Sequence, residues 1–424
     1  MLAKQASVSA GAARVPRVSE GGRPPGVFSV GEFRVLWAAA AQSIIGDQLA
    51  RVALSILVYQ RTGSAGWTAA MYALTQLPAL LSGVLLSGLA DRLPRRAVMV
   101  GCDLARAGLV GVMALPGAPL PLLAVLLVLV QLADAPFAAA QGATLPHVLP
   151  GERFERGQRA LLITHQAGLL AGFAVGGLLV AWVGTHAALA IDAGTFLLSA
   201  ALIRAGVQAR PVSGAAPGKV ALQVRGGARL IWADRRLRSL VGLAWLAGFA
   251  VVPEGLAAPF AAEVGVGVAA VGWLLAADPA GMVVGAWLLG KLSTERRLQL
   301  LGPLAIGTVV PLGCYLLAPS LGFALALLAI SGACSAYQVT AGATFVQLVP
   351  DHQRGQALGL ARSGLVAAQG IGVAAGGLLA ELLDGPSTAI AAAGLVGLVF
   401  AVNATAAWAR VGARRVAAAL TADN

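Results

Sequence analysis

Charged residues are scarce in this sequence. Asp, Glu, Lys and Arg make up 11% of its 424 residues, whereas hydrophobic residues make up 58%. A soluble globular protein has about 25% charged and about 45–50% apolar residues, so this composition excludes a soluble enzyme of two or three domains. The high apolar content also excludes a disordered chain. A polytopic membrane protein remains, and at about 20 apolar residues per helix the chain can form roughly twelve spans.

Cysteine is also rare, and enzyme motifs are absent from the sequence. The three cysteines, Cys102, Cys314 and Cys334, lie singly in apolar runs, without the spacing typical of a disulfide or a metal site. There is no GxxxxGK[ST] phosphate loop, so we expect no direct use of ATP. There is also no GxSxG or HExxH motif. We therefore expect no catalytic site, no metal and no cofactor.

Apolar runs recur along the chain with short polar breaks between them. They predict spans at 35–59, 66–89, 97–115, 120–142, 160–183 and 187–204, then at 239–261, 266–289, 299–317, 321–345, 358–380 and 387–408. The predicted organisation is a tail (1–32), a bundle (33–204), a connector (205–238), a second bundle (239–408) and a C-terminal tail (409–424). The second part of the connector mixes apolar and basic residues, as a helix lying along a membrane surface does.

The basic residues lie on one side of the predicted topology. The tails, the connector and the alternate breaks contain 26 of the 30 Lys and Arg residues, counting Arg34 and Arg204, and the opposite loops contain only Arg61. Because cytoplasmic loops are enriched in Lys and Arg, we expect both tails and the connector to be cytoplasmic, in the plasma or inner membrane. Topology beside anionic lipid explains the net charge of +12, so we expect no nucleic-acid partner.

The two halves of the chain repeat each other at an offset of 200 residues. The offset relates Gly142-Ala143-Thr144 to Gly342-Ala343-Thr344, Pro150 to Pro350, and Gly172, Gly176 and Gly177 to Gly372, Gly376 and Gly377. A duplicated six-span unit with both ends on one side is typical of a transporter with a pathway between two bundles. We predict an all-α integral membrane fold of twelve helices in two six-helix bundles.

The break after the second predicted span reads Gly88-Leu89-Ala90-Asp91-Arg92-Leu93-Pro94-Arg95-Arg96. It resembles the G-x-L-A-D-R-x-G-R-R signature of the major facilitator superfamily, with Pro94 in place of the usual glycine. The resemblance implies that family's fold and a cytoplasmic gate in which Asp91 meets the start of the eleventh span. We assign this gate motif to Gly88, Asp91, Arg92, Arg95 and Arg96, with Asp103 and Arg106 in the third span and Arg362 in the eleventh.

Glycines in the fifth predicted span form a second motif. Gly168, Gly172, Gly176 and Gly177 resemble the family's antiporter motif, with Phe173 in place of proline. Two interpretations stay open: an exporter-type hinge, or ordinary close contact between helices. Other stretches, including Phe33-Arg34 with Leu36-Trp37, Gly46-Asp47 and Cys102-Asp103 with Arg106-Ala107, resemble the branch of macrolide and siderophore exporters.

Ionisable residues inside the predicted spans are functional candidates, because a charge in hydrocarbon is costly unless it is paired or faces water. Asp47 lies near the middle of the first span, beside Gln48 and one turn before Arg51. We predict a protonation site here; the alternative is a static ion pair. Further proton or substrate candidates are Glu254, Asp278 and Asp134, the last of which could instead bridge helices.

The sequence as a whole predicts a secondary active transporter. We expect a monomeric proton-coupled antiporter that exports a small amphipathic compound, such as a drug, an antibiotic or a siderophore-like molecule, by alternating access. The alternative is a proton-coupled importer of a small nutrient. Such an importer usually offers several polar or basic cavity groups, and Arg362 is the only basic residue in the predicted spans of the second half. The expected partners are the substrate, protons and the lipid bilayer.

Overall fold

The computed structural model describes residues 26–78, 93–210, 220–350, 353–383 and 385–412. Every regular element in these residues is a helix, which confirms the predicted all-α class. Ten helical segments in the described residues are long and apolar enough to cross a membrane. The second predicted span runs on into residues outside the description, and the third carries four charged residues over its 19-residue helix.

The first half of the chain begins with a short 3-10 helix and continues in long helices. The elements are η1 (Val27–Ser29), α1 (Gly31–Thr62), α2 (Ala65–Ala73), α5 (Arg95–Met113), α6 (Leu120–Val148), α7 (Glu152–Val183) and α8 (Thr185–Gly206). A glycine in the left-handed region, Gly63, ends α1, and the side chain of Ser64 accepts a hydrogen bond from the backbone of Trp67 to begin α2. The chain therefore reverses direction within two residues.

The helices of the second half are shorter and more numerous than the spans predicted for it. Its elements are α9 (Val220–Ala233), α10 (Arg235–Trp245), α11 (Ala247–Ala250), α12 (Val252–Gly255), α13 (Ala257–Glu263), α14 (Ala269–Gly290), α15 (Thr294–Gly313), η2 (Cys314–Leu317), α16 (Leu321–Ser335), α17 (Tyr337–Leu348), α18 (Arg354–Leu382) and α19 (Pro386–Val411). The seventh predicted span, 239–261, is divided among α10 to α13. Pro253 and Pro259 lie in these short helices and lack the N–H group that continues a helix.

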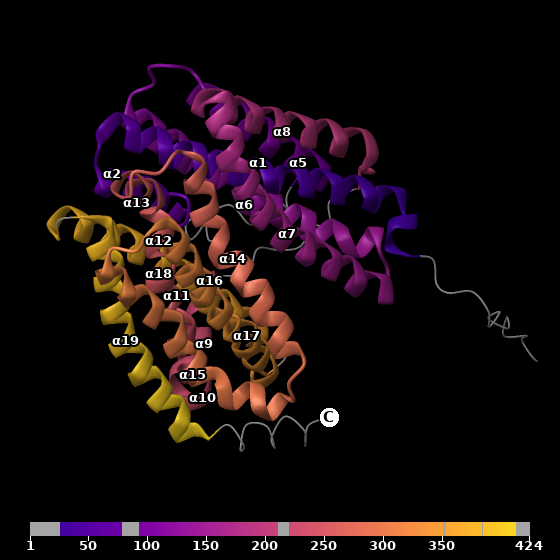
Figure 1. Ribbon diagram of the computed structural model, residues 1–424. Coiled ribbons are helices and arrows are strands. Elements are labelled where there is room, and N and C mark those ends of the chain that lie inside the picture. The colour runs from indigo at the N-terminus through magenta and orange to yellow at the C-terminus, as the bar shows by residue number, and fades with distance from the viewer. Residues whose placement is uncertain (1–25, 79–92, 211–219, 351–352, 384, 413–424) are drawn as a thin grey trace, which may run out of the picture.

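The helices form two groups that meet at one end. One end of the molecule holds α9 and the starts of α1, α5, α7, α10, α15 and α18, and we name it the connector end. We name the opposite end the distal end. The two groups join at the distal end, where α7 contacts α14 and α2 contacts α18, and they diverge toward the connector end (Figure 1). The halves are thus held together at the distal end.

The buried hydrophobic residues follow the same division. One cluster is shared by both halves and contains, for example, Phe173 of α7 and Phe260 of α13. A second cluster is confined to the connector side of the second half, around Leu301 and Trp408. A third is confined to the connector side of the first half, around Phe33. A continuous core therefore crosses between the halves only toward the distal end of the described chain.

Glycines allow the closest contacts between these helices. A Cβ atom on Gly177 would lie 2.7 Å from Cα of Gly272 in α14, and one on Gly377 in α18 would clash with the side chain of Ala69 in α2. Gly177 and Gly377 are related by the 200-residue offset, and both lie at a contact between the halves. Backbones can approach this closely only where neither residue carries a larger side chain. The sequence repeat therefore corresponds to a repeated interface.

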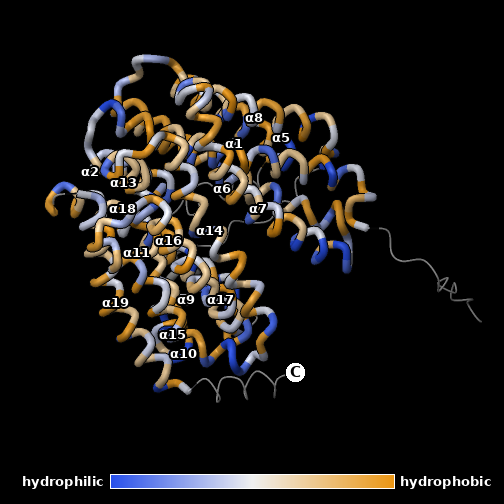
Figure 2. Tube along the Cα trace, in the orientation of Figure 1, coloured by the Kyte–Doolittle hydropathy of each residue, from blue (hydrophilic) through white to orange (hydrophobic). Residues whose placement is uncertain are grey.

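The outer surface of the helices is apolar. Figure 2 shows hydrophobic residues along the lengths of the helices and hydrophilic residues toward their ends. Large apolar side chains such as Trp182 and Leu378 are more than half exposed. An apolar exposed surface of this extent is expected where helices face lipid. The chain is accordingly a multi-pass membrane protein.

The close contact of α14 with α16 gives a prediction on stability. A side chain on Gly281 would clash with the carbonyl oxygen of Ala329, whereas a Cβ on Gly108 of α5 has no atom within 4 Å. We expect Gly281→Val to lower the free energy of unfolding of the purified protein by about 1–3 kcal/mol, the usual cost of overpacking. Gly108→Val is the matched control and should leave the melting temperature nearly unchanged. Equal melting temperatures for the two variants would contradict the contact.

Candidate functional site

Arg106, near the middle of α5, is a buried cation with several compensating contacts. Its side chain is 5% exposed and donates to Asp103 Oδ1 over 3.0 Å and to Asp134 Oδ1 of α6 over 3.5 Å. Its guanidinium carbon lies 4.6 Å from the ring centroid of Phe137 and 4.8 Å from that of Phe196. Two carboxylates and two aromatic rings thus compensate a cation that has lost water. The structure places this pair at mid-helix, away from the connector end of α5.

Asp47 lies near the middle of α1 and is half-buried. Its carboxylate is within electrostatic range of Arg51, Arg106 and Asp134. Among the described residues no direct ion pair joins Asp47 to Arg51 or to Arg106. Asp47 is therefore attracted electrostatically by both guanidinium groups but forms a direct ion pair with neither.

A fourth carboxylate lies beside Asp47. Asp192 of α8 is 1% exposed and accepts a hydrogen bond from Thr195 Oγ1 over 3.1 Å. A Cβ on Gly46 would lie 2.5 Å from Asp192 Oδ1, so only glycine at this position lets the acid of α8 approach α1. The sequence marks Asp192 as an acid in an apolar span, but it gives no sign that this acid lies next to Asp47.

The charges of this cluster do not balance. We name it the first-half cluster; its members are Asp47, Asp103, Asp134, Asp192, Arg51 and Arg106. Four carboxylates face two guanidinium groups, so full ionisation would leave two negative charges uncompensated within the helices. An uncompensated charge at this depth is strongly unfavourable. The arrangement therefore favours the uptake of protons, or of another cation, by the cluster.

The glycines of the fifth span pack α7 against α1 around Asp47. A Cβ on Gly172 would lie 2.7 Å from Cβ of Gln48, and one on Gly168 would lie 2.7 Å from the side chain of Ile44. Gly176 faces Leu49 in the same way, and Gly177 faces α14 of the other half. Gln48 itself is 3% exposed, and its Oε1 atom has no hydrogen-bond partner among the described residues. The motif thus joins the Asp47 segment to the contact between the halves.

A hydrogen bond between the halves lies close to this cluster. Tyr72 of α2 donates its hydroxyl to Glu254 Oε2 of α12 over 2.5 Å. Glu254 is within electrostatic range of Arg51, and Asp278 of α14 is within range of Glu254. The ionisable groups therefore continue from the first half into the second. Tyr72 was not predicted as a site residue; its only signal in the sequence is a polar hydroxyl in an apolar span.

Two of the predicted gate arginines, Arg95 and Arg96, lie at the connector end, away from this site. Arg95 donates to the carbonyl of Ala143 over 2.7 Å, and Arg96 donates to that of Val207 over 3.2 Å, so both tie helices of the first half together at the connector end. Arg362 of α18 is exposed and lies within electrostatic range of His165 in α7. Three further predicted gate residues, Gly88, Asp91 and Arg92, lie outside the described residues.

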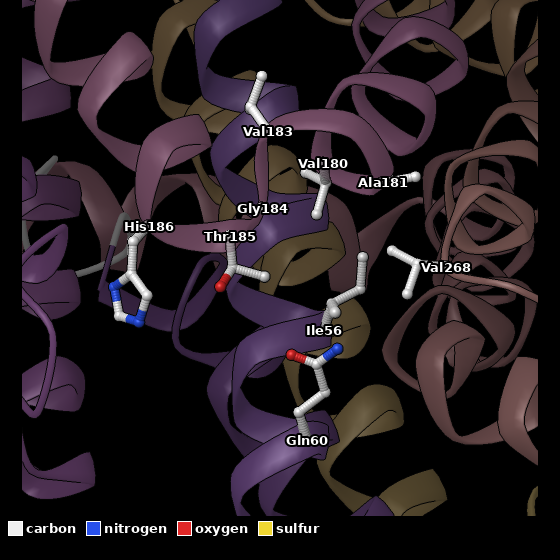
Figure 3. A pocket seen from close by; sticks show the side chains of 9 residues that line it. All are labelled: Ile56, Gln60, Val180, Ala181, Val183, Gly184, Thr185, His186 and Val268. Atoms are coloured by element: carbon white, nitrogen blue, oxygen red, sulfur yellow. The ribbon is translucent and has the colours of Figure 1, made fainter.

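A cavity of about 580 Å³ lies at the distal end, mainly on the first half, with one lining residue from the second half. It is lined by Ile56, Gln60, Val180, Ala181, Val183, Gly184, Thr185, His186 and Val268. Figure 3 shows Ala181 at the end of α7 facing Val268, the residue before α14. None of the ionisable residues of the first-half cluster lines this cavity. It is therefore distinct from the site at mid-helix.

Comparison with known proteins identifies the family. The sequence profile described as Major Facilitator Superfamily matches residues 36–253 and 254–422, which together make up most of the chain. The chain belongs to the Major Facilitator Superfamily. These matches confirm the family that the motif at 88–96 indicates. No curated protein matches the sequence.

Solved structures of transporters share the fold of this superfamily member. A bacterial homolog of the human lysosomal transporter Spinster, inward-facing and unoccupied, is 16% identical, with a TM-score of 0.70 over 92% of this chain and 99% of its own. A POT family transporter in complex with 5-aminolevulinic acid is 12% identical, with a TM-score of 0.72 over 92% and 100%. A nucleoside transporter is 14% identical, with a TM-score of 0.68 over 89% and 100%. At these identities the likeness establishes the fold alone.

Arg106 gives a prediction on how charge is balanced. We expect Arg106→Leu to destabilise the protein by about 3–5 kcal/mol, because it leaves the buried Asp103 carboxylate without its partner. Asp103→Asn should restore much of that loss in the double variant, since the amide carries no charge. Thermal unfolding of the two single variants and the double variant gives the coupling energy. Strictly additive losses would show that the two side chains do not depend on each other.

Proposed function

We propose that this superfamily member is a proton-coupled antiporter that exports a small amphipathic compound across the cell membrane by alternating access. The observation that carries the proposal is the unbalanced first-half cluster together with the Tyr72–Glu254 hydrogen bond to the second half. The cluster lies toward the middle of α1, α5 and α6, at the depth where the two bundles of a transporter of this architecture hold their substrates and coupling ions.

The arrangement of the halves supports alternating access. The halves share one hydrophobic cluster toward the distal end and have separate clusters on the connector side. With the connector end at the cytoplasm, as the distribution of basic residues predicts, this is the inward-facing arrangement. Transport outward then requires that the distal contacts separate while the connector ends approach each other. Rocking of one bundle against the other provides this motion.

Asp47 is the proposed proton carrier. Unlike Asp103 and Asp134, it makes no direct ion pair within the described chain, and it is half-buried, so a proton can reach it. Protonation of Asp47 removes one of the two excess negative charges of the cluster. Its segment of α1 contacts the glycines of α7, and Gly177 of α7 contacts α14. The charge of Asp47 can therefore influence the contact between the halves.

Glu254 and Asp278 are the proposed substrate-facing acids of the second half. Both are half-buried in apolar helices, and neither is in a salt bridge among the described residues. A carboxylate in an apolar surrounding suits an amphipathic compound with a cationic group. A cationic substrate at these acids and a proton on Asp47 would each neutralise negative charge in the same polar region, so the binding of one would disfavour the binding of the other.

Everted membrane vesicles with an acidic interior test the exchange. Addition of cationic or neutral amphipathic compounds should collapse the pH gradient when the wild-type protein is present. We expect Asp47→Asn to reduce this collapse at least tenfold, because the amide cannot exchange protons. The matched control is Glu155→Gln, which removes an exposed acid at the start of α7 and should behave as wild type.

Each result of the vesicle assay has a defined meaning. Collapse that survives Asp47→Asn would move the proton to Glu254 or Asp278. Collapse that is absent with every amphipathic compound but present with nutrients, in vesicles of the opposite orientation, would favour the importer. No exchange with either group of compounds would contradict proton-coupled transport.

Binding of a permanent cation tests the acids of the second half. Tetraphenylphosphonium carries no exchangeable proton, so its binding to the purified protein reports on negative charge at the binding site without proton exchange. We expect Glu254→Gln to weaken this binding about tenfold and Tyr72→Phe to strengthen it, because the variant frees Glu254 Oε2 from its donor. Equilibrium dialysis with Tyr59→Phe as the matched control measures both effects. Unchanged binding in Glu254→Gln would exclude this residue as a cation site.

A further inference from the structure

We propose that Glu381, at the end of α18, is a positioning residue of the transport cycle, and that its carboxylate latches the distal end shut by binding the start of α2. The inference rests on the proposed alternating access, and it adds a residue to which neither the family motifs nor the charge cluster points. Glu381 lies in the second half and α2 lies in the first, so the contact crosses between the bundles.

The geometry is that of a carboxylate at a helix N-terminus. Glu381 Oε1 accepts a hydrogen bond from the backbone N–H of Gly66 over 2.8 Å and another from Ser64 Oγ over 2.6 Å. Ser64 also begins α2, since its Oγ accepts from the backbone N–H of Trp67 over 3.0 Å. The first N–H groups of a helix have no partner within the helix and attract negative charge. The carboxylate of one bundle thus accepts hydrogen bonds at the N-terminus of a helix in the other bundle.

The surrounding residues are small, which brings the two helices close enough for this contact. A Cβ on Gly66 would lie 3.0 Å from Glu381 Cγ and 3.2 Å from Oε1. One turn earlier in α18, Gly377 faces Ala69, and a Cβ on Gly377 would lie 3.3 Å from Cα of Gly66. Neither bond can persist if α2 and α18 separate, because both donors belong to α2 or to its first cap.

The repeat-related contact lacks such a latch. The 200-residue offset relates Glu381 to Ala181, which has no carboxylate. Ser64 directly precedes α2, whereas Val268, which has no hydroxyl, directly precedes α14. Ala181 and Val268 line the distal cavity (Figure 3). The α7–α14 contact is therefore held by glycines next to an open space, whereas the α2–α18 contact also has a charged hydrogen-bond acceptor. We expect opening at the distal end to depend on the release of this one carboxylate.

The alkylation rate of a cysteine at the interface measures that opening. The test uses the full-length protein in detergent, with Cys102, Cys314 and Cys334 replaced and Ala69→Cys introduced. Ala69 is 0% exposed, so a maleimide reacts in proportion to the fraction of molecules whose distal end is open, however small that fraction is. We expect Glu381→Ala to raise the alkylation rate about fivefold, as for the loss of a helix cap. Glu381→Gln, which keeps one acceptor, should raise it less.

Glu263→Ala is the matched control. Glu263 lies at the same end of the molecule and accepts a hydrogen bond from the backbone N–H of Ser387 over 3.0 Å, at the start of α19. This contact stays within the second half. Both alanine variants remove a carboxylate from a helix N-terminus and should lower the melting temperature by similar amounts. Only Glu381→Ala should raise the alkylation rate.

The outcomes separate the latch from a structural role and from the proposed function. An unchanged alkylation rate in Glu381→Ala, or an equal rise in Glu263→Ala, would overturn the latch. The assay contains no transported compound and no pH gradient, so it can support the latch even if the vesicle assay finds no exchange. Conversely, proton exchange in vesicles with an unchanged alkylation rate would leave the proposed function standing without this latch.

Discussion

Close contact between backbones at the distal end is the constraint on which the rest of this structure depends. In lipid, apolar side chains gain little from leaving one helix surface for another, so helices associate where small residues let their backbones approach. Gly177 against Gly272, and Gly377 against Ala69, supply such contacts between the two halves. Because these contacts lie toward one end, the halves can diverge at the other. A hinge-like motion follows from where the small residues lie.

The second constraint is that charges within the helices must be compensated. Arg106 is fixed by two carboxylates and two aromatic rings, and Asp47 lies within electrostatic range of the second guanidinium group of the cluster, that of Arg51. Tyr72 and Glu254 extend the polar region into the second half. Loading this region with a proton or a cationic compound changes the electrostatic free energy near α7 and α2, the two helices of the first half that make the most extensive contacts with the second. The site and the interface are thus coupled through shared helices.

The fold followed from the sequence more completely than the site did. Hydropathy and the 200-residue repeat predicted an all-α membrane protein, and the motif at 88–96 indicated the family. The narrower exporter branch stays a prediction. The sequence assigns Asp103 and Arg106 to the cytoplasmic gate motif, but the structure puts them at mid-helix with Asp134 as a third partner. Helix rotation and depth decide such contacts, and a single sequence does not fix either one. Contacts that depend on the approach of two distant helices, such as Glu381 with Gly66, leave no local pattern at all.

The most direct measurement of the central claim is the distance across each end of the same molecule. Spin labels at Leu115 and Leu317 report on the distal end, and labels at Glu155 and Arg296 report on the connector end; all four side chains are exposed. Double electron–electron resonance should show two states in which one distance lengthens as the other shortens, with acidification changing their ratio in wild type but not in Asp47→Asn. Distances that vary independently, or a single state at every pH, would contradict the account.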